Sequence, residues 1–423
     1  MNFKSLIENK QHLISGIFIF FYSILLSIFL IEWNKIALLT NDSPSYIEFA
    51  KNIIQGKPFL NITRTPIYPI FLCLFNLKPH FIIFFQVLIA ALSAELLYYL
   101  IYQLTKKTQL SLGIVFLSIS DYQIIKYQNI ILPETLSIFL LLLYITLCTL
   151  LIKKNLFIIY FFTTLTGVLL MMVKPIFIFL PFILYSVVLL RYRKMLNIKI
   201  FPIVVYVIIF FIWVVLSHFY ISTVSISKIL DINLIGKIIY YDLIEKKDIK
   251  NPVIYDMYST IKSNNKLTPY ELRDILLSKG YNDKEIFSAG YQVIFENKLS
   301  FLTKSFIIIP SILIDRRDKN ITYNNSLLWN TYHFIDYIDG FILLIISALF
   351  FFRKTRNIIK EKLDLNILLF FILSSWYTLI TVSFTGYNEF ARLRIPIIMI
   401  LHSLSFLFIY FFLLKIYKSL AKI

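Results

Sequence analysis

Long apolar stretches alternate with short polar segments along almost the whole chain. Most of these stretches approach the ~20 residues that an α-helix needs to cross ~30 Å of hydrocarbon. The pattern predicts an all-α polytopic membrane protein with about 10 transmembrane helices. The predicted spans lie near residues 12–33, 80–104, 108–120, 132–152, 156–173, 175–190, 200–222, 334–352, 366–384 and 393–414.

Basic residues recur in every second connection between these stretches, as in Lys106-Lys107 and Lys153-Lys154. Lys and Arg in short loops concentrate on the cytoplasmic side of a membrane. We therefore expect both termini to be cytoplasmic. This orientation predicts three regions. Residues 1–222 form an N-terminal transmembrane module with catalytic outer loops at 34–79 and 121–133. Residues 223–333 form an extracytoplasmic region, and residues 334–423 form C-terminal transmembrane helices.

The segment 299–320 is apolar but does not fit this scheme. If it crossed the membrane, Arg353, Lys354 and Arg356 would lie outside, against the charge rule. We interpret it as an interfacial or re-entrant helix broken at Pro310. The extracytoplasmic region also contains a predicted soluble helix, whose capping residues are Thr268, Pro269, Glu271 and Gly280.

Composition supports a membrane protein, because 58% of the residues are hydrophobic and only 16% are charged. The net charge of 42 − 24 = +18 is attributed to cytoplasmic loops and membrane lipids rather than to nucleic acid, for which no motif is present. The usage of Ile, Asn, Lys, Phe and Tyr suggests a bacterial source, hence the cytoplasmic (inner) membrane. Cys73 and Cys148 lie in apolar stretches and are interpreted as buried thiols.

Polar residues cluster just after the first apolar stretch, in "NDSPSYIEFAKNIIQGKPFLNITRTPIYP". Ser45 and Glu48 have capping-box spacing, and an apolar stripe that includes Tyr46 predicts a short amphipathic helix on the membrane face. An interfacial anchor would explain the stripe. It would not explain Asp42 before the helix, or Arg64 held between the helix and two prolines.

Further ionisable residues lie at the ends of other predicted spans, and the charge rule places them on the same outer face. Such residues are costly near lipid and are therefore functional candidates. The alternatives are snorkelling for Lys174 and Arg394, helix capping for Glu134, and local pairing of Glu389 with Arg392. The five histidines show no metal-ligand spacing, and we interpret His218 and His402 as packed side chains.

Such a group of residues suits transfer of a sugar from a lipid-linked phosphate. A carboxylate can accept a proton from an attacking hydroxyl. Arginine and lysine can hold a phosphate and stabilise it as it leaves. A polyprenyl chain would explain a site located where the bilayer meets water.

The first outer loop resembles that of GT-C glycosyltransferases, closest to the dolichyl-phosphate-mannose-protein mannosyltransferase and aminoarabinose transferase group. The residues that match in order are Asp42, Tyr46, Ala50, Gly56, Arg64, Pro66, Tyr68 and Pro69. "LPETL", "VKP" and "NEFARLRIPI" resemble later landmarks, although Lys174 stands where arginine is usual. Residues 297–298 also depart from the family, being Asn-Lys where Asn-Pro or His-Pro is common.

This resemblance implies a GT-C-like bundle and an inverting transfer from a polyprenyl-phosphate-linked sugar. Asp42 would be the general base, and Glu134 a second acid that orients the acceptor or binds a metal. Substrate-binding candidates are Tyr46, Arg64, Tyr68, Lys174, Glu389, Arg392 and Arg394. The acceptor would be an extracytoplasmic glycan, lipid or protein. A divalent metal is left open, with no metal ligand assigned.

Two other functions compete with this one. A polymerase or ligase of lipid-linked glycans also has many spans and a large outer loop, but it would not require Asp42. A flippase or transporter of polyprenyl-linked sugars predicts Gly/Pro-broken helices and charges near mid-membrane. The chain has only nine glycines, and its charges gather at one face, which disfavours transport.

Overall fold

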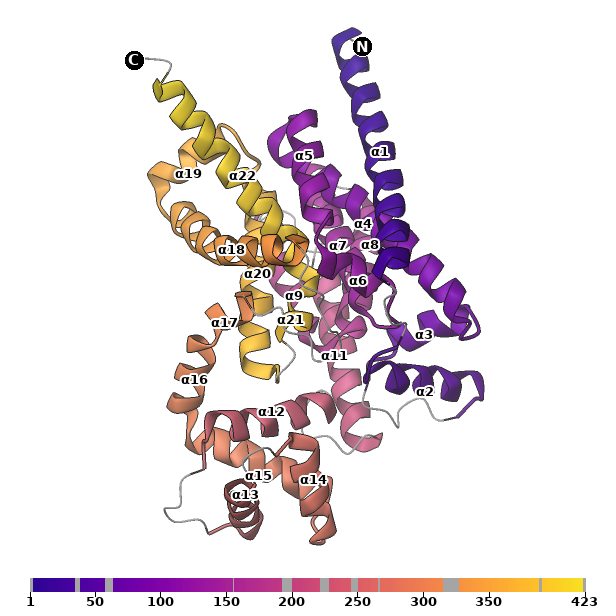
Figure 1. Cartoon of the computed structure of the whole chain (residues 1–423), viewed down its shortest axis with the longest axis vertical. Coiled ribbons are helices and arrows are strands. Elements are labelled where there is room, and N and C mark those ends of the chain that lie inside the picture. Colours follow the sequence, from indigo (N-terminus) through magenta and orange to yellow (C-terminus); the bar gives the residue numbers. More distant parts are fainter. Residues whose placement is uncertain are drawn as a thin grey trace.

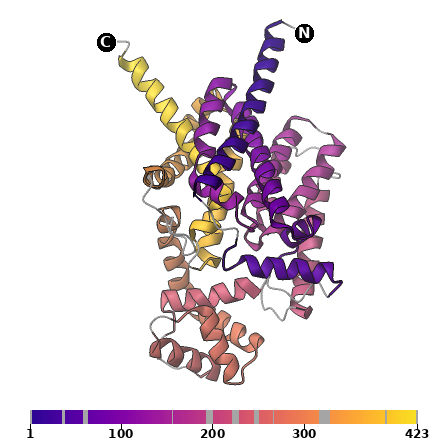
Figure 2. The ribbon, with the colours of Figure 1, turned by 45° about the vertical axis from the view of Figure 1, so that its right-hand side comes forward.

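The computed structural model describes residues 3–34, 39–57, 64–154, 156–191, 200–220, 228–244, 250–264, 267–314, 327–387 and 390–420. Within these ranges the chain is helical and no strand occurs. Both termini lie at one end of the molecule, and a group of outer helices lies at the other (Figures 1 and 2). The predicted topology and the identity of the cytoplasmic side stay predictions.

Six of the described helices are long and apolar enough to cross a membrane, so the chain is a polytopic helical membrane protein. They lie at Gln11–Phe29, Pro79–Thr105, Glu134–Lys153, His333–Phe351, Leu365–Thr385 and Ile395–Leu414. The other four predicted spans form shorter apolar helices, at Thr108–Ile119, Phe157–Val173, Pro175–Arg191 and Phe201–Leu216. A total of about 10 crossings therefore stays a prediction.

The N-terminal helices form a bundle in which α4 (Pro79–Thr105) packs between α1 (Phe3–Asn34) and α7 (Glu134–Lys153). Much of α1 turns large apolar side chains outward, including Leu25, which is 66% exposed. Such a surface suits contact with lipid. The remaining helices of this half are α5 (Thr108–Ile119), α6 (Tyr122–Gln128), α8 (Phe157–Val173), η1 (Pro175–Phe177), α9 (Leu180–Arg191) and α11 (Phe201–Tyr220).

The C-terminal half adds α18 (Leu327–Phe351), α20 (Leu365–Thr385) and α22 (Ile395–Leu420) to this bundle. Helix α22 packs against α18 and α20 as well as against α5 and α7 of the first half. It therefore joins the two halves of the chain. Two short helices, α19 (Arg353–Lys360) and α21 (Phe390–Leu393), precede α20 and α22 respectively.

The outer helices enclose an apolar core of their own, which includes Ile235, Met257, Leu272 and Phe287. The predicted capped helix is confirmed: Thr268 and Glu271 form a capping box at its start, and Gly280 follows its end with φ +97°. The four helices are α12 (Lys228–Tyr241), α13 (Pro252–Ser263), α14 (Pro269–Ser278) and α15 (Asp283–Glu296).

The segment predicted to be interfacial or re-entrant is broken, as Pro310 suggests. A single residue, Ile308, separates helix α16 (Lys298–Ile307) from helix α17 (Ile309–Ile314). Pro310 is the second residue of α17. The chain bends by 85° where α15 meets α16 and α17. Residues 315–320 lie outside the described ranges, and whether this segment crosses the membrane stays untested.

Helices α2 (Ser43–Ile54) and α3 (Ile67–Leu74) pack against each other beside the bundle. The apolar stripe of α2 is buried: Tyr46, Phe49 and Ala50 are at most 4% exposed. These three residues of the stripe face protein, whereas Ile54 at the end of the helix is 49% exposed, so an anchoring role alone does not explain the stripe. This packing holds the N-terminal end of α2 near the start of α7 and near α21.

Candidate functional site

The start of α2 differs from the predicted capping box. The helix begins at Ser43, with Pro44 in its first turn and Asp42 in the N-cap position. The Ser45 hydroxyl therefore lies inside the helix, where it donates to the Asp42 carbonyl oxygen (2.7 Å) and accepts from Arg64 Nε (2.9 Å). The capping-box interpretation was wrong because proline favours the first helical turn and moves the helix start forward.

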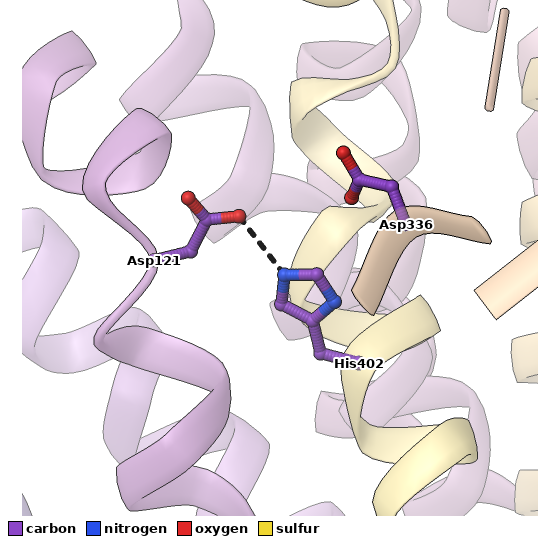
Figure 3. A group of neighbouring side chains, drawn as sticks. All are labelled: Asp121, Asp336 and His402. Carbon is purple, nitrogen blue, oxygen red and sulfur yellow. Dashed lines mark hydrogen bonds and ion pairs between the residues drawn. The ribbon is translucent and has the colours of Figure 1, made fainter. Parts of the chain in front are cut away.

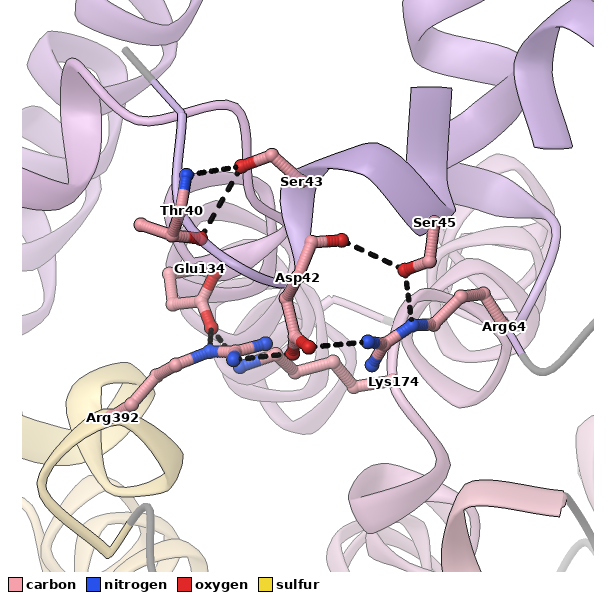
Figure 4. Close-up of polar contacts among 8 residues, drawn as sticks. All are labelled: Thr40, Asp42, Ser43, Ser45, Arg64, Glu134, Lys174 and Arg392. Atoms are coloured by element: carbon pink, nitrogen blue, oxygen red, sulfur yellow. Dashed lines mark hydrogen bonds and ion pairs between the residues drawn. The ribbon is translucent and has the colours of Figure 1, made fainter. Parts of the chain in front are cut away.

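The Asp42 carboxylate instead faces two arginines from distant parts of the chain (Figure 4). Its Oδ1 lies 2.7 Å from Arg64 Nη2, and its Oδ2 accepts from Arg392 Nη1 at 2.5 Å. Arg64 precedes α3 and Arg392 belongs to α21. Three segments therefore meet at this one carboxylate.

Glu134, the first residue of α7, is joined to the same network through Arg392. Its Oε1 accepts from Arg392 Nε at 2.6 Å and from Lys174 Nζ at 2.9 Å. The residue is fully buried, and its second oxygen, Oε2, has no hydrogen-bond partner in the described part of the chain. A buried carboxylate oxygen without a donor is costly. It is therefore well suited to accept a hydrogen bond from a ligand.

The network of Asp42, Glu134, Arg64, Lys174 and Arg392 is named the charged cluster below. Within the described part of the chain it contains two carboxylates and three cations, an excess of one positive charge. Glu134 is its deepest member, whereas the Asp42 side chain is 23% exposed and forms its open edge. Buried cations that outnumber carboxylates favour an anion such as a phosphate.

The two arginines also control the acidity of Asp42. Burial opposes its ionisation, but Arg392 and Arg64 outweigh burial and lower the pKa of Asp42 to about 2. The carboxylate is thus ionised at neutral pH. It is a weak proton acceptor for as long as both arginines hold it.

Tyr46 supports the charged cluster from α2. The Arg64 guanidinium lies over its ring, with Cζ 4.7 Å from the ring centroid. This cation–π contact fixes the direction of the guanidinium. Tyr46 in turn packs edge-to-face on Tyr68, with 5.3 Å between ring centroids.

Tyr68 lies outside the charged cluster. It is fully buried, and its hydroxyl donates to Gln86 Oε1 at 2.7 Å. The Gln86 amide donates to the carbonyl oxygens of Gln128 and Ile130. The tyrosine therefore braces the turn that leads into Glu134.

Of the other predicted site residues, Arg394 is not part of the charged cluster. Arg394 Nη2 lies 2.7 Å from Asp336 Oδ2 in a separate buried group. Glu389 lies outside the described residues. The charged cluster thus unites five of the nine predicted site residues, with Tyr46 packed against it.

The separate group contains four residues that the sequence analysis did not select: Asp121, Asp336, Asp339 and His402 (Figure 3, which draws three of them). His402, interpreted as a packed side chain, contacts Asp121 and Asp339. One signal was available. Asp336 and Asp339 are three residues apart in an apolar run, hence on one helix face, and acids in such a run are costly.

Lys237 of α12 is a second residue that the pattern did not reveal. It is fully buried and lies 4.8 Å from the ring centroid of Phe390, two residues before Arg392. Burial lowers its pKa to about 7. A lysine in an amphipathic helix is ordinarily solvated, so its burial depends on how α12 docks.

The chain matches no known family model, and the search of curated proteins found no match. The GT-C resemblance of the first outer loop therefore stays a prediction. The geometry of the charged cluster is the basis for a functional proposal.

Proposed function

We propose that the chain is a membrane glycosyltransferase of the GT-C type. It moves a sugar from a polyprenyl-phosphate donor to an extracytoplasmic acceptor, which is a cell-envelope glycan, a lipid or a protein. The observation that supports this proposal best is the charged cluster, in which Arg392 joins the carboxylates of Asp42 and Glu134.

The donor phosphate binds between Arg64 and Arg392. Both guanidinium groups now hold the Asp42 carboxylate, which has the planar, two-oxygen geometry that arginine also recognises in a phosphate. The phosphate competes with Asp42 for these donors. Lys174, held by the same Glu134 oxygen as Arg392, adds a further positive charge to the site.

Transfer is a displacement at the anomeric carbon. A hydroxyl of the acceptor attacks that carbon from the side opposite the phosphate, and its proton passes to Asp42. The carbon–oxygen bond to the phosphate breaks, and the polyprenyl phosphate leaves with the electron pair. The anomeric configuration inverts, and the arginines stabilise the charge that develops on the phosphate.

The basicity of Asp42 is tied to donor binding in this scheme. With both arginines in place its pKa is about 2, which is far from ideal for a general base. A bound phosphate draws the arginines away, and the carboxylate becomes a stronger base. Glu134 Oε2, which lacks a partner in the described chain, accepts a hydrogen bond from a sugar hydroxyl.

The residues of the charged cluster do not fit a divalent metal. Each carboxylate is already held by cationic side chains, and Arg392 lies between them. A metal ion there would be repelled by three positive groups. The proposed transfer therefore uses no metal at this site.

Complementation with a conservative variant tests the proposal. Mass spectrometry of envelope glycans is compared between a strain that lacks the gene and strains that carry wild type, Asp42→Asn or Glu48→Gln. Glu48 is an exposed acid on the same helix and serves as the matched control. We expect wild type and Glu48→Gln to restore the missing glycan and Asp42→Asn to fail, with all proteins present in the membrane. Restoration by Asp42→Asn would overturn the proposal.

A further inference from the structure

A second buried group lies where three elements from distant parts of the chain meet. Asp121 precedes α6, Asp336 and Asp339 belong to α18, and His402 belongs to α22. All four are at most 2% exposed. Figure 3 shows the carboxylates of Asp121 and Asp336 directed toward the imidazole ring.

Both nitrogens of His402 face carboxylate oxygens. Nδ1 lies 2.6 Å from Asp339 Oδ2, and Nε2 lies 2.9 Å from Asp121 Oδ2. A neutral imidazole has only one N–H, so one of these contacts would set a lone pair against a carboxylate oxygen. The contact requires a positive charge, which is either a second proton or a metal ion.

Asp339 favours the arrangement found around metal-bound histidines. Its Oδ1 accepts from Ser405 Oγ at 2.5 Å, which leaves Oδ2 to accept from His402 Nδ1. A carboxylate that accepts from one ring nitrogen directs the lone pair of the other nitrogen toward a metal. Here that other nitrogen, Nε2, points at Asp121.

The contacts described here leave the group rich in negative charge. Three carboxylates and Arg394 sum to −2 when the imidazole is neutral, before the fully buried Lys126, five residues after Asp121, is counted. Buried charge is strongly disfavoured unless it is compensated, and a divalent cation would compensate it.

We propose that Asp121, Asp336 and His402 Nε2 bind a divalent transition-metal ion of the zinc class, with Asp339 as the residue that orients His402. One ligand atom from each of the three lies within 4.8 Å of the others. Small side-chain rotations bring such atoms to the roughly 2.0–2.2 Å bond lengths of zinc with nitrogen and oxygen. The mixed nitrogen and oxygen ligand set suits zinc and manganese better than calcium.

The ion would connect α6, α18 and α22. The segment from Asp121 leads through α6 to Glu134, and Arg394 lies two residues after Arg392. The metal site would therefore fix two of the chain segments that contribute to the charged cluster, those of Glu134 and Arg392. The inference does not depend on sugar transfer, because its test measures the metal itself.

The test uses the full-length protein in detergent, stripped with a chelator, reloaded with Zn²⁺ and desalted. We expect about one zinc per chain by elemental analysis, and a higher unfolding temperature than that of the stripped protein. His402→Gln and Asp336→Asn should each lower the retained zinc at least severalfold. His80→Gln, which changes an exposed histidine at the start of α4, should retain it.

A second measurement on wild type alone covers the case in which the variants do not fold. Co²⁺ loaded in place of Zn²⁺ should give visible d–d absorption, and Zn²⁺ should displace it. Less than a tenth of an equivalent of either metal on folded wild type would overturn the proposal. So would equal zinc retention by wild type and a folded His402→Gln variant. Either result would mean that the positive charge between the carboxylates is a second proton on His402 and not a metal ion.

Discussion

At the scale of single residues, the charged cluster is a set of mostly buried ions that stabilise one another, with Asp42 at its open edge. Glu134 is fully buried and satisfies two cations with one oxygen. Removing one member of a buried ion pair is far more costly than removing the pair, because it leaves the partner uncompensated. The stability of this site therefore depends on matched charges rather than on any single residue.

Glu134→Gln should accordingly destabilise the protein by about 3–5 kcal/mol. Lys174→Met in the same background should recover part of this loss, because it removes the uncompensated ammonium group. Unfolding in one detergent measures both variants. The control is Asp242→Asn, which breaks an exposed pair with Lys262 (3.0 Å) and should cost less than about 1 kcal/mol. Equal costs for Glu134→Gln and Asp242→Asn would contradict this account.

At the scale of elements, the docking of α12 determines the surroundings of α21. A Cβ added to Gly236 of α12 would lie 2.6 Å from the ring of Tyr387, just before α21. Lys237 packs on Phe390 at the next position. The outer helices are thus held close to the segment that carries Arg392.

Gly236→Ala should therefore push α12 away from α21, lower stability by about 1–3 kcal/mol and impair transfer. Gly290→Ala is the matched control in α15, because its new Cβ would lie 3.4 Å from Ile238, an ordinary contact. That control should be neutral, or gain up to about 1 kcal/mol from helix propensity. Thermal unfolding of the two variants decides the point. Identical unfolding temperatures would show that α12 does not rest on Tyr387.

The sequence allowed the charged cluster to be predicted because each member is an ion at the edge of an apolar run. The sequence did not show that Arg392 and Arg394 belong to two different sites. They are two residues apart, yet one reaches Asp42 and the other Asp336. Residues two apart on a helical turn point in different directions, and which partner each meets is set by tertiary packing. The partners of His402 could not be predicted for the same reason, because they lie 281 and 63 residues away in the sequence and only tertiary packing brings them together.

At the scale of the whole molecule, the outer helices and the two termini lie at opposite ends (Figure 1). The charged residues that follow α7 and α9 fit a cytoplasmic side shared with the termini. The charged cluster and α12–α15 would then face the cell exterior. This orientation is required for an extracytoplasmic acceptor.

Cysteine labelling of intact cells tests the orientation, in a chain whose Cys73 and Cys148 are replaced by alanine. A cysteine at Asp274, whose side chain is 69% exposed in α14, should react with a membrane-impermeant maleimide. A cysteine at Lys154, exposed just after α7, should react only after the cells are permeabilised. The reverse pattern would place the charged cluster on the cytoplasmic face.

The charged cluster should hold a polyprenyl phosphate, and native mass spectrometry can test this without knowledge of the sugar or the acceptor. Polyprenyl phosphate is compared with the polyprenol of equal length on wild type, Arg64→Gln/Arg392→Gln, Asp42→Asn and the exposed-site control Arg191→Gln. Charge-assisted hydrogen bonds of about 1.5–3 kcal/mol each predict at least a roughly tenfold preference of wild type for the phosphate. The double arginine variant should lose this preference and Arg191→Gln should keep it. Asp42→Asn should bind the phosphate more tightly, because the competing carboxylate charge is gone. Equal binding of phosphate and polyprenol by wild type would show that the charged cluster does not recognise the phosphate.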